Sequence, residues 1–345
     1  MKKISILIPC HNSVRTLRRT WDSVKAQTMN IRDLEVIFID DASDDDGATR
    51  AMLQDIESEA PESVLLIMLD ENLRQGGARN VGLQYVSGEY VLFLDSDDTL
   101  RKETCQELYS LASEYKAELI QFQHRNIADD KELKNIPANA PVKGDIRLYD
   151  LADEQNRKSL LTMGMATAGC SNKLYSSDLL ARCGSSYAEK VFYEEPKFVY
   201  PLFLYASRII ITDKDYYEYH WHLGSTMTSK LGIHLMDHPQ VQLEMMEDLM
   251  GREAYTAYSE EIDLYFFFSF YIETLMFAQT NKGEIDPGQL RSLQDICRTV
   301  IPHIATNVYV NKSEDMIWAA ATIENGYDDA GAIKTLEAEM AKRFA

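Results

Sequence analysis

The chain has 345 residues, of which 45% are hydrophobic and 26% are charged. This ordinary composition excludes collagen-like, disordered and disulfide-scaffold proteins, and the length predicts two structural units. With 35 basic and 55 acidic residues the formal net charge is −20. Such a charge repels polyanions, so no nucleic-acid partner is expected.

The cysteines and the apolar stretches favour a soluble cytoplasmic protein. Five scattered cysteines without Cys-x-x-Cys spacing predict neither a disulfide framework nor a zinc site, and they fit a reducing compartment. The basic N-terminus is interpreted as a first strand rather than a signal peptide. The longest apolar stretch, 264–277, contains Glu273 and is too short to span a bilayer. It predicts a buried helix, with acceptor docking or peripheral contact with the inner face of the membrane as the alternative.

The first 120 residues alternate between apolar strands and helical patterns. Strands are predicted at 3–9, 34–40, 64–69 and 90–95, and a helical pattern follows each of them. This alternation predicts a Rossmann-like α/β fold, a mostly parallel sheet with helices on both faces. The later segments predict a strand at 118–123, a long surface loop at about 124–145, a loop and helix at 170–180, a helix at 192–205 and a strand at 208–213.

The composition changes near residue 234. Glycine becomes sparse there, and helical patterns then follow one another to the end of the chain. We therefore divide the chain into an α/β domain, 1–233, and a C-terminal helical domain, 234–345. The second domain is expected to shape the acceptor side of a site or a subunit contact.

Three aspartates follow the fourth predicted strand. Asp95, Asp97 and Asp98 lie at its carboxyl end, where sheets of this kind bind ligands. Mn²⁺ and Mg²⁺ prefer oxygen ligands and bridge carboxylates to phosphates, so the cluster predicts a cation that holds a diphosphate on an acidic protein. The alternative is a plain aspartate-rich turn that caps the next helix.

Other polar residues follow the neighbouring strands. Asp40 and Asp41 end the second strand. After the third, Gly76 and Gly77 allow close backbone approach near a helix start, and Arg79 adds a forked donor. The alternative for the two glycines is an ordinary tight turn.

As a set, these motifs resemble the family 2 glycosyltransferases, a large GT-A group that includes many bacterial polysaccharide-assembling enzymes. The matching segments span about residues 4–226 and read ISILIPCHN, VIFIDDASDD, NLRQGGARNVGL, GEYVLFLDSDD, SNKLY, FYEEPKF and YYEYHWHLGST. The resemblance implies a GT-A domain that binds a nucleotide-diphosphosugar.

The resemblance also assigns roles to particular residues. It implies a nucleotide pocket formed by Pro9, His11, Asn12, Asp40, Asn72, Gly77, Arg79, Asp95 and Ser96. Asp40 is expected to bind the base, and His11 stands where the family often has Tyr, in a position compatible with stacking. Asp97, with Asp95, is expected to bind the metal.

The acidic pair at 194–195 is the candidate general base. Inverting family members commonly carry this base in a Glu-Asp-x-x-Phe type segment, which here reads Glu194-Glu195-Pro196-Lys197-Phe198. Glu195 occupies the base position, with Glu in place of Asp, and Glu194 competes with it. The alternative is that both acids only favour the helix dipole.

Two histidines stand where the family tends to carry Arg. The resemblance implies that His220 or His222 meets the pyrophosphate or adds a metal ligand. Alternation along a strand would place both side chains on one face. A packed structural histidine is the alternative for either one.

The resemblance implies transfer of a sugar from a nucleotide-diphosphosugar, expected to be a UDP-sugar, to an acceptor hydroxyl, with Mn²⁺ or Mg²⁺ and inversion, in cell-surface polysaccharide or glycoconjugate assembly. The acceptor is left open between a saccharide, a lipid-linked and a protein-linked molecule, and a homo-oligomer is also left open. One alternative is a haloacid-dehalogenase-like phosphatase with Asp95 as nucleophile. Another is a sugar-nucleotide-binding protein without catalysis.

Overall fold

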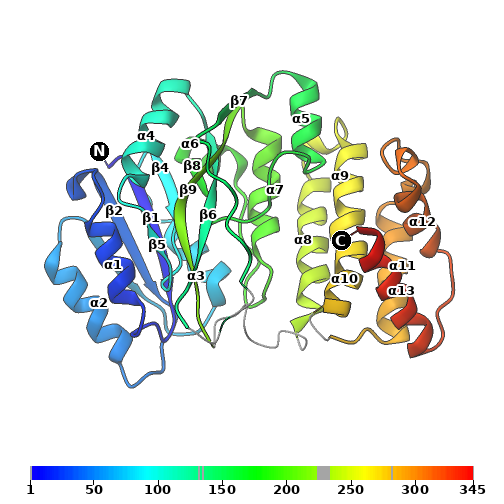
Figure 1. Cartoon of the computed structure of the whole chain (residues 1–345), viewed down its shortest axis with the longest axis horizontal. Helices are drawn as coiled ribbons and strands as arrows, with labels where there is room; N and C mark the ends of the chain where they lie inside the picture. The colour runs from blue at the N-terminus through cyan, green and yellow to red at the C-terminus, as the bar shows by residue number, and fades with distance from the viewer. Residues whose placement is uncertain (1, 131–132, 134–135, 224–233, 281–282, 345) are drawn as a thin grey trace.

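A computed structural model of the chain describes residues 2–130, 133, 136–223, 234–280 and 283–344. Figure 1 shows an α/β part built on one sheet and, beside it, a group of helices that continues to the C-terminus. The two parts meet along helix α7 (Glu195–Tyr205) and helix α8 (Asp237–Met250).

Within the described residues, nine strands form one mixed sheet. They are β1 (Ile4–Cys10), β2 (Leu34–Asp40), β3 (Val64–Met68), β4 (Tyr90–Phe93), β5 (Thr99–Leu100), β6 (Leu119–Ala128), β7 (Ile146–Asp150), β8 (Lys173–Ser176) and β9 (Arg208–Trp221). Their order is β3-β2-β1-β4-β8-β6-β9-β5, and β7 also pairs with β9. Strands β1 to β4 run parallel, whereas β8 is antiparallel to its neighbours β4 and β6.

The chain changes its direction across the sheet after β3. Strands β2 and β3 are added on one side of β1, and β4 then pairs with β1 on the other side. The carboxyl ends of β1 and β4 therefore flank a topological switch point, which is where open α/β sheets bind their ligands.

Both faces of the sheet are covered because its central strands are apolar on both sides. In β1, Ile6 and Ile8 belong to one hydrophobic cluster and Leu7 belongs to the other, since successive side chains of a strand point to opposite faces. The first face is covered by α1 (Leu17–Lys25), α2 (Ala48–Glu59) and α4 (Thr104–Tyr115). The second is covered by α3 (Arg74–Leu83), α5 (Glu154–Leu161), α6 (Ser177–Cys183) and α7.

The predicted α/β fold with helices on both faces is confirmed. Strands β2 to β4 lie within the predicted strand ranges, and β1 runs one residue past its predicted end, to Cys10. Beyond β4 the sheet is mixed. Segment 170–180, predicted as loop and helix, contains strand β8. The sequence does not predict this strand because the buried Lys173 at its start interrupts the apolar pattern. Strands β6 and β9 run to Ala128 and Trp221, beyond their predicted ends, because they pair with each other over that length. The loop predicted at 124–145 therefore begins later in the chain. It is followed by strand β7, and the sequence does not predict this strand.

Helices continue to the C-terminus. They are α8, α9 (Ser259–Phe266), α10 (Glu273–Thr280), α11 (Pro287–Val300), α12 (Glu314–Thr322) and α13 (Ala330–Phe344). A π-helical segment, Phe267–Ile272, joins α9 to α10 without a break, and Phe267 and Phe270 are buried. The predicted buried helix at 264–277 is thus confirmed. Among the described residues, no helix combines the length and apolar character needed to cross a membrane.

One hydrophobic core joins the helical part to the sheet. A single cluster contains Leu7 of β1, Phe203 of α7 and Met245 of α8. The ring of Tyr200 in α7 stacks on Tyr265 in α9, with centroids 4.1 Å apart and planes 6° apart. The predicted domain boundary follows residue 233, and residues 224–233 lie outside those described. The division into two domains therefore stays a prediction.

The shared core predicts that the two parts unfold together. Removing residues after 233 would take away Tyr265 and expose the buried face of α7 to water, which is unfavourable in proportion to the apolar area exposed. We expect one calorimetric transition for the full chain, with equal calorimetric and van't Hoff enthalpies, and no cooperative melting for residues 1–233 alone. Two separate transitions, or a folded 1–233 fragment, would show independent domains instead.

Candidate active site

A polar cavity of about 500 Å³ opens at the switch point. It is formed by residues that follow β1, β2 and β4, by the start of α3 and by the end of β9. The lining consists of Pro9, Cys10, His11, Asn12, Ser13, Arg15, Thr16, Asp41, Gln75, Asp95, Ser96, Asp97, His222 and Leu223. The cavity is therefore where an α/β sheet is expected to hold a ligand.

Short polar contacts fix the loops around this cavity. Asn12 has a left-handed backbone, with φ of 53°, a conformation that Asn tolerates better than most residues. Its Oδ1 accepts from the Asp44 amide at 2.9 Å, and its Nδ2 donates to Asp44 Oδ1 at 2.6 Å. The hydroxyls of Ser13 and Ser96 lie 2.7 Å apart. These contacts hold the loop after β1 against the loops after β2 and β4.

The three carboxylates after β4 have different surroundings. Asp97 is the most exposed of them, and burial, followed by the charge of Asp95, raises its pKa. Asp98 is 1% exposed and accepts from the Tyr217 hydroxyl at 2.6 Å and from the His220 amide at 2.7 Å. Burial and the charges of Asp97 and Asp95 raise the pKa of Asp98 to about 9. Asp98 is thus a buried structural partner, whereas Asp97 and Asp95 face the cavity.

The two histidines differ in their access to the cavity. The Nε2 atom of His222 lies 2.9 Å from Asp97 Oδ2. Burial lowers the pKa of His222, but the hydrogen bonds with Asp97 and the Leu223 backbone and the charges of Asp97 and Asp129 together outweigh it, so the net shift is upward. The side chain of His220 is buried, with Nδ1 2.8 Å from Asp129 Oδ1 and Nε2 3.0 Å from Thr99 Oγ1. Both ring nitrogens of His220 are therefore engaged in the core, and only His222 lines the cavity.

Asp97 and Asp95 could give carboxylate ligands to a divalent cation, and His222 lies beside Asp97. Carboxylates suit Mn²⁺ or Mg²⁺. After burial, the charge of Asp95 is the next cause of the raised pKa of Asp97, and a cation would offset that repulsion. Within the described residues, no group of three or more Cys, His, Asp or Glu side chains is placed so that together they could hold a metal ion. This fits an ion that takes only one or two carboxylates from the protein and its other ligands from phosphate and water.

A buried ion-pair bridge leads away from the cavity. Arg79 of α3 is 2% exposed. Its Nη2 donates to Asp95 Oδ1 at 2.7 Å and its Nη1 donates to Glu194 Oε1 at 2.6 Å. Gly76, one turn earlier, makes room for the partner segment, since a Cβ there would lie 2.8 Å from Glu194 Cγ. The bridge connects the end of β4 to the start of α7.

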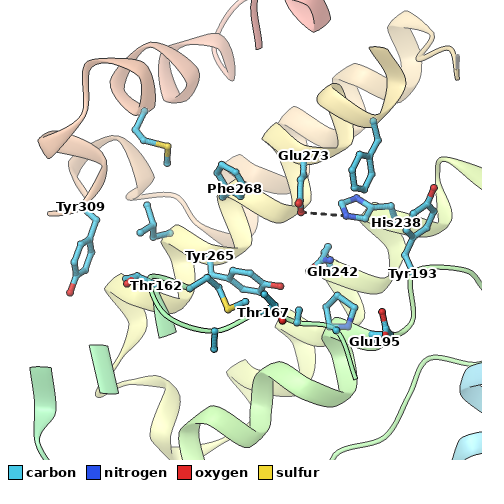
Figure 2. Close-up of a pocket in the computed structure, with 18 of the residues that line it drawn as sticks. Thr162, Thr167, Tyr193, Glu195, His238, Gln242, Tyr265, Phe268, Glu273 and Tyr309 are labelled. Atoms are coloured by element: carbon cyan, nitrogen blue, oxygen red, sulfur yellow. Dashed lines mark ion pairs between the residues drawn. The ribbon is translucent and has the colours of Figure 1, made fainter. Parts of the chain in front are cut away.

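Glu195 lies beyond this bridge, at the first position of α7. Its Oε1 accepts from the Cys170 amide at 2.7 Å. Figure 2 shows Glu195 on the wall of a second cavity, of about 790 Å³, between the loop at 162–169, α7 and the C-terminal helices. The two candidate bases therefore differ, because Glu194 is committed to Arg79 and Glu195 faces a cavity.

Tyr219 of β9 relates the two groups of acids. Burial raises the pKa of its hydroxyl, and the charges of Asp98, Asp95, Asp97 and Glu195 raise it further. Electrostatic influence of this kind falls off steeply with distance in a solvated protein. The carboxylates after β4 and the carboxylate of Glu195 therefore act on the pKa of the same hydroxyl.

The structure brings together about half of the predicted site. The cavity is lined by the predicted residues Pro9, His11, Asn12, Asp95, Ser96, Asp97 and His222. In the described part of the chain, the predicted residues Asp40, Asn72, Gly77, Arg79, Glu194, Glu195 and His220 lie outside that lining. Asn72 adjoins it, with Nδ2 3.2 Å from His11 Nδ1. A Cβ on Gly77 would lie 2.4 Å from Leu73 Cβ, so Gly77 serves packing within α3. The functional roles of all these residues stay predictions.

Asp41 takes the place at the cavity that the sequence assigns to Asp40. Asp40 is fully buried and its Oδ2 accepts from Arg50 Nε at 2.6 Å. Asp41 lines the cavity and accepts from the Leu73 amide at 2.7 Å. Strand alternation offered a signal, since neighbouring residues point to opposite sides. Ser13 and Arg15, which none of the matching segments contains, also line the cavity, as does Gln75, which lies within the segment NLRQGGARNVGL but has no predicted role.

A polar cavity with paired carboxylates at the switch point of an α/β sheet is typical of nucleotide-dependent enzymes. Residues 5–183, more than half of the chain, match Glycosyl transferase family 2. The chain belongs to the family 2 glycosyltransferases, as its motifs indicate. This membership decides against the phosphatase alternative.

Relatives and solved structures agree with the family. The chain is 33% identical over 154 residues to poly(ribitol-phosphate) beta-N-acetylglucosaminyltransferase TarP of Staphylococcus aureus, covering 44% of this chain and 45% of that protein. It is 27% identical over 280 residues to cholesterol galactosyltransferase of Borreliella burgdorferi, covering 78% and 73%. The crystal structure of residues 1–349 of S. aureus TarS with UDP-GlcNAc matches with a TM-score of 0.72 at 20% identity, over 99% of this chain and 92% of that one. The fold is thus of the GT-A type followed by C-terminal helices.

The Arg79 bridge predicts a large loss of stability on substitution. Arg79→Met leaves Asp95 and Glu194 as unpaired carboxylates, and breaking a buried pair in this way costs about 3–5 kcal/mol. Urea unfolding measures the loss. Arg18→Met, which removes the exposed pair with Glu59, is the control and should cost at most about 1 kcal/mol. Equal losses in both variants would show that the bridge does not support the fold.

Lys173 anchors the wall of the second cavity. Its side chain is fully buried, and Nζ donates to the Gly169 carbonyl at 2.5 Å, to Asn172 Oδ1 at 2.9 Å and to Thr167 Oγ1 at 3.2 Å. Thr167 and Gly169 line the cavity. Burial lowers the pKa of Lys173 from 10.5 to about 7.

This pKa predicts a pH-dependent stability. Between about pH 7 and 10.5 the unfolded chain binds more protons at Lys173 than the folded chain does, so the free energy of unfolding rises with pH, by up to about 1.4 kcal/mol per unit. Urea unfolding at pH 7, 8 and 9 should show this rise in the parent protein and its absence in Lys173→Met. Lys102→Met, at an exposed lysine, should keep it. Parallel profiles for all three proteins would contradict the assignment.

Proposed function

We propose that the protein is a metal-dependent, inverting glycosyltransferase that moves a sugar from a UDP-sugar to an acceptor hydroxyl in cell-surface polysaccharide or glycoconjugate assembly. The observation that carries the proposal is the polar cavity at the switch point, which is lined by Asp95 and Asp97 and which the Arg79 bridge connects to the start of α7, where Glu195 lies. The TarS structure described with UDP-GlcNAc and the sugar-transferring relatives support it. Because the alignment spans less than half of TarP, its donor and acceptor are not carried over.

The donor would lie in the polar cavity. Pro9, His11 and Asn12 would contact the nucleoside, and Arg15, which lines the same cavity, would meet the phosphates. Asp97, Asp95 and His222 would hold Mn²⁺ or Mg²⁺, which when bound supplies positive charge beside the diphosphate and its leaving oxygen. The Pyrobaculum calidifontis mannosyltransferase PcManGT, described with GDP-Man and Mn²⁺, has a related fold, with a TM-score of 0.51.

The acceptor would react on the other side of the bridge. Glu195 would take the proton of the acceptor hydroxyl while the hydroxyl oxygen bonds to the anomeric carbon, and the bond from that carbon to the diphosphate would break. The Cys170 amide holds Oε1 of Glu195, which leaves Oε2 to receive the proton. Glu194, paired with Arg79, would position its neighbour rather than react.

The proposal predicts different effects of two substitutions. Asp97→Asn should remove the Mn²⁺-dependent rise in melting temperature on adding UDP, because the cation loses its carboxylate. Glu195→Gln should keep that rise yet lower transfer by about 100-fold or more, the usual contribution of a general base. Thermal melting with a panel of UDP-sugars, followed by measurement of UDP release and sugar transfer, reads both effects.

The control is Glu154→Gln, because Glu154 also occupies the first turn of its helix, α5, and its loss tests the helix-dipole alternative. This variant should melt and turn over like the parent. Full turnover by Glu195→Gln would refute the base assignment. UDP binding without any transfer or donor hydrolysis would favour a non-catalytic binding protein.

A further inference from the structure

The second cavity is large and mostly apolar. It has a volume of about 790 Å³ and lies between the loop at 162–169, the start of α7, the helices α8 to α10 and the segment 309–316. Much of its wall consists of Met163, Leu264, Phe268, Phe277 and Met316. Cavities of this size and character are the usual sites of small ligands in proteins.

Polar groups gather on one side of this cavity. Figure 2 shows Glu195, Gln242, His238 and Glu273 on the same side, with Phe268 and Tyr309 farther away. His238 Nδ1 lies 2.9 Å from Thr274 Oγ1, and Nε2 lies 3.7 Å from Glu273 Oε2. These groups come from α7, α8 and α10, so the fold brings them together from distant parts of the chain.

Gln242 marks the place of a missing partner. Its side chain is 1% exposed, and Oε1 has no hydrogen-bond partner among the described residues. A buried polar atom without a partner is unfavourable and is uncommon in native proteins. The nearby Tyr193, which stacks on Phe277, also has a buried hydroxyl without a partner in the described residues. A ligand hydroxyl would satisfy Gln242 Oε1 as a donor.

The charges of the lining disfavour an anionic ligand. Glu195 and Glu273 are carboxylates, and among the described lining residues Lys312 is the only lysine or arginine. Lys312 Nζ lies over the Tyr309 ring, 4.8 Å from its centroid, and Figure 2 shows Tyr309 away from the polar side. With a net charge of −20, the chain as a whole also repels a polyphosphate chain.

We propose that this cavity is the acceptor site and that it takes a neutral alcohol with an apolar body; this rests on the proposed function. The apolar body lies against Leu264, Phe268 and Phe277, and the hydroxyl lies between Gln242 and Glu195. Its proton goes to Glu195, its oxygen bonds to the anomeric carbon, and UDP leaves from the far side of the Asp95–Arg79–Glu194 bridge. A polyanionic acceptor of the poly(ribitol phosphate) kind is excluded from the cavity by its charge.

The test measures binding without any donor. Cholesterol and 1-dodecanol, delivered in cyclodextrin, serve as neutral apolar alcohols with a rigid and a flexible body, and poly(ribitol phosphate) and maltoheptaose serve as polar competitors. At least one of the two alcohols should bind in equilibrium dialysis and raise the melting temperature, whereas neither polar compound should. Binding of either alcohol supports the proposal, and the two together report the shape of the body it accepts.

Two variants locate the binding. Gln242→Leu should weaken alcohol binding by about tenfold through loss of one hydrogen bond, and Phe268→Glu should abolish it by placing a charge in the apolar wall. Gln240→Leu, exposed on the same helix, and Ile317→Glu, exposed beside Met316, are the matched controls and should bind like the parent. The UDP-induced rise in melting temperature should persist in all four variants and so shows that they are folded.

Two results would overturn the proposal. One is alcohol binding that is unchanged in both Gln242→Leu and Phe268→Glu, because the alcohol would then bind outside the second cavity. The other is transfer of sugar to poly(ribitol phosphate) or maltoheptaose with no binding of either alcohol. Failure of the proposed function has a different signature, because it removes UDP binding or transfer and leaves the dialysis result intact.

Discussion

The structure depends on one buried guanidinium between two carboxylates. Arg79 connects Asp95, at the end of a central strand, to Glu194, at the start of α7. Glu194 is 6% exposed and would not stay charged in the interior alone. Arginine is suited to the place because its planar fork donates in two directions and keeps its charge. The bridge therefore fixes how α7 meets the sheet, and with it the position of Glu195 relative to the polar cavity.

The same reasoning explains which parts of the fold the sequence predicts. Strands such as β1 and β4 are apolar on both faces and are followed by helical periodicity, so local pattern identifies them. Local pattern does not predict strand β8, because the strand begins with Lys173. A buried lysine can be explained only once its acceptors, such as the Gly169 carbonyl, are known. The extension of β9 to Trp221 likewise depends on its pairing with β6, a long-range contact that local pattern does not contain.

The candidate site divides in a similar way. Motif residues in the loops that follow strands, such as Asn12 and Asp97, reach the cavity because the carboxyl ends of parallel strands meet at one edge. Side-chain direction decides the rest. Asp40 turns into the core toward Arg50 while Asp41 lines the cavity, and His220 is held by Asp129 from a distant segment. A motif fixes the residue type and the approximate place, and tertiary partners decide which neighbour faces the ligand.

The cavities on the two sides of the Arg79 bridge favour ligands of different charge. At the polar cavity, Asp95 and Asp97 disfavour a diphosphate unless a cation accompanies it, so cation and donor depend on each other there. At the apolar cavity, no cation faces Glu195 from the described lining near the polar side, and its carboxylate is left to meet a neutral proton donor. An acidic protein can thus handle a negatively charged leaving group on one side and deprotonate an alcohol on the other, because Arg79 pairs with Glu194 and leaves the charge of Glu195 for the reaction.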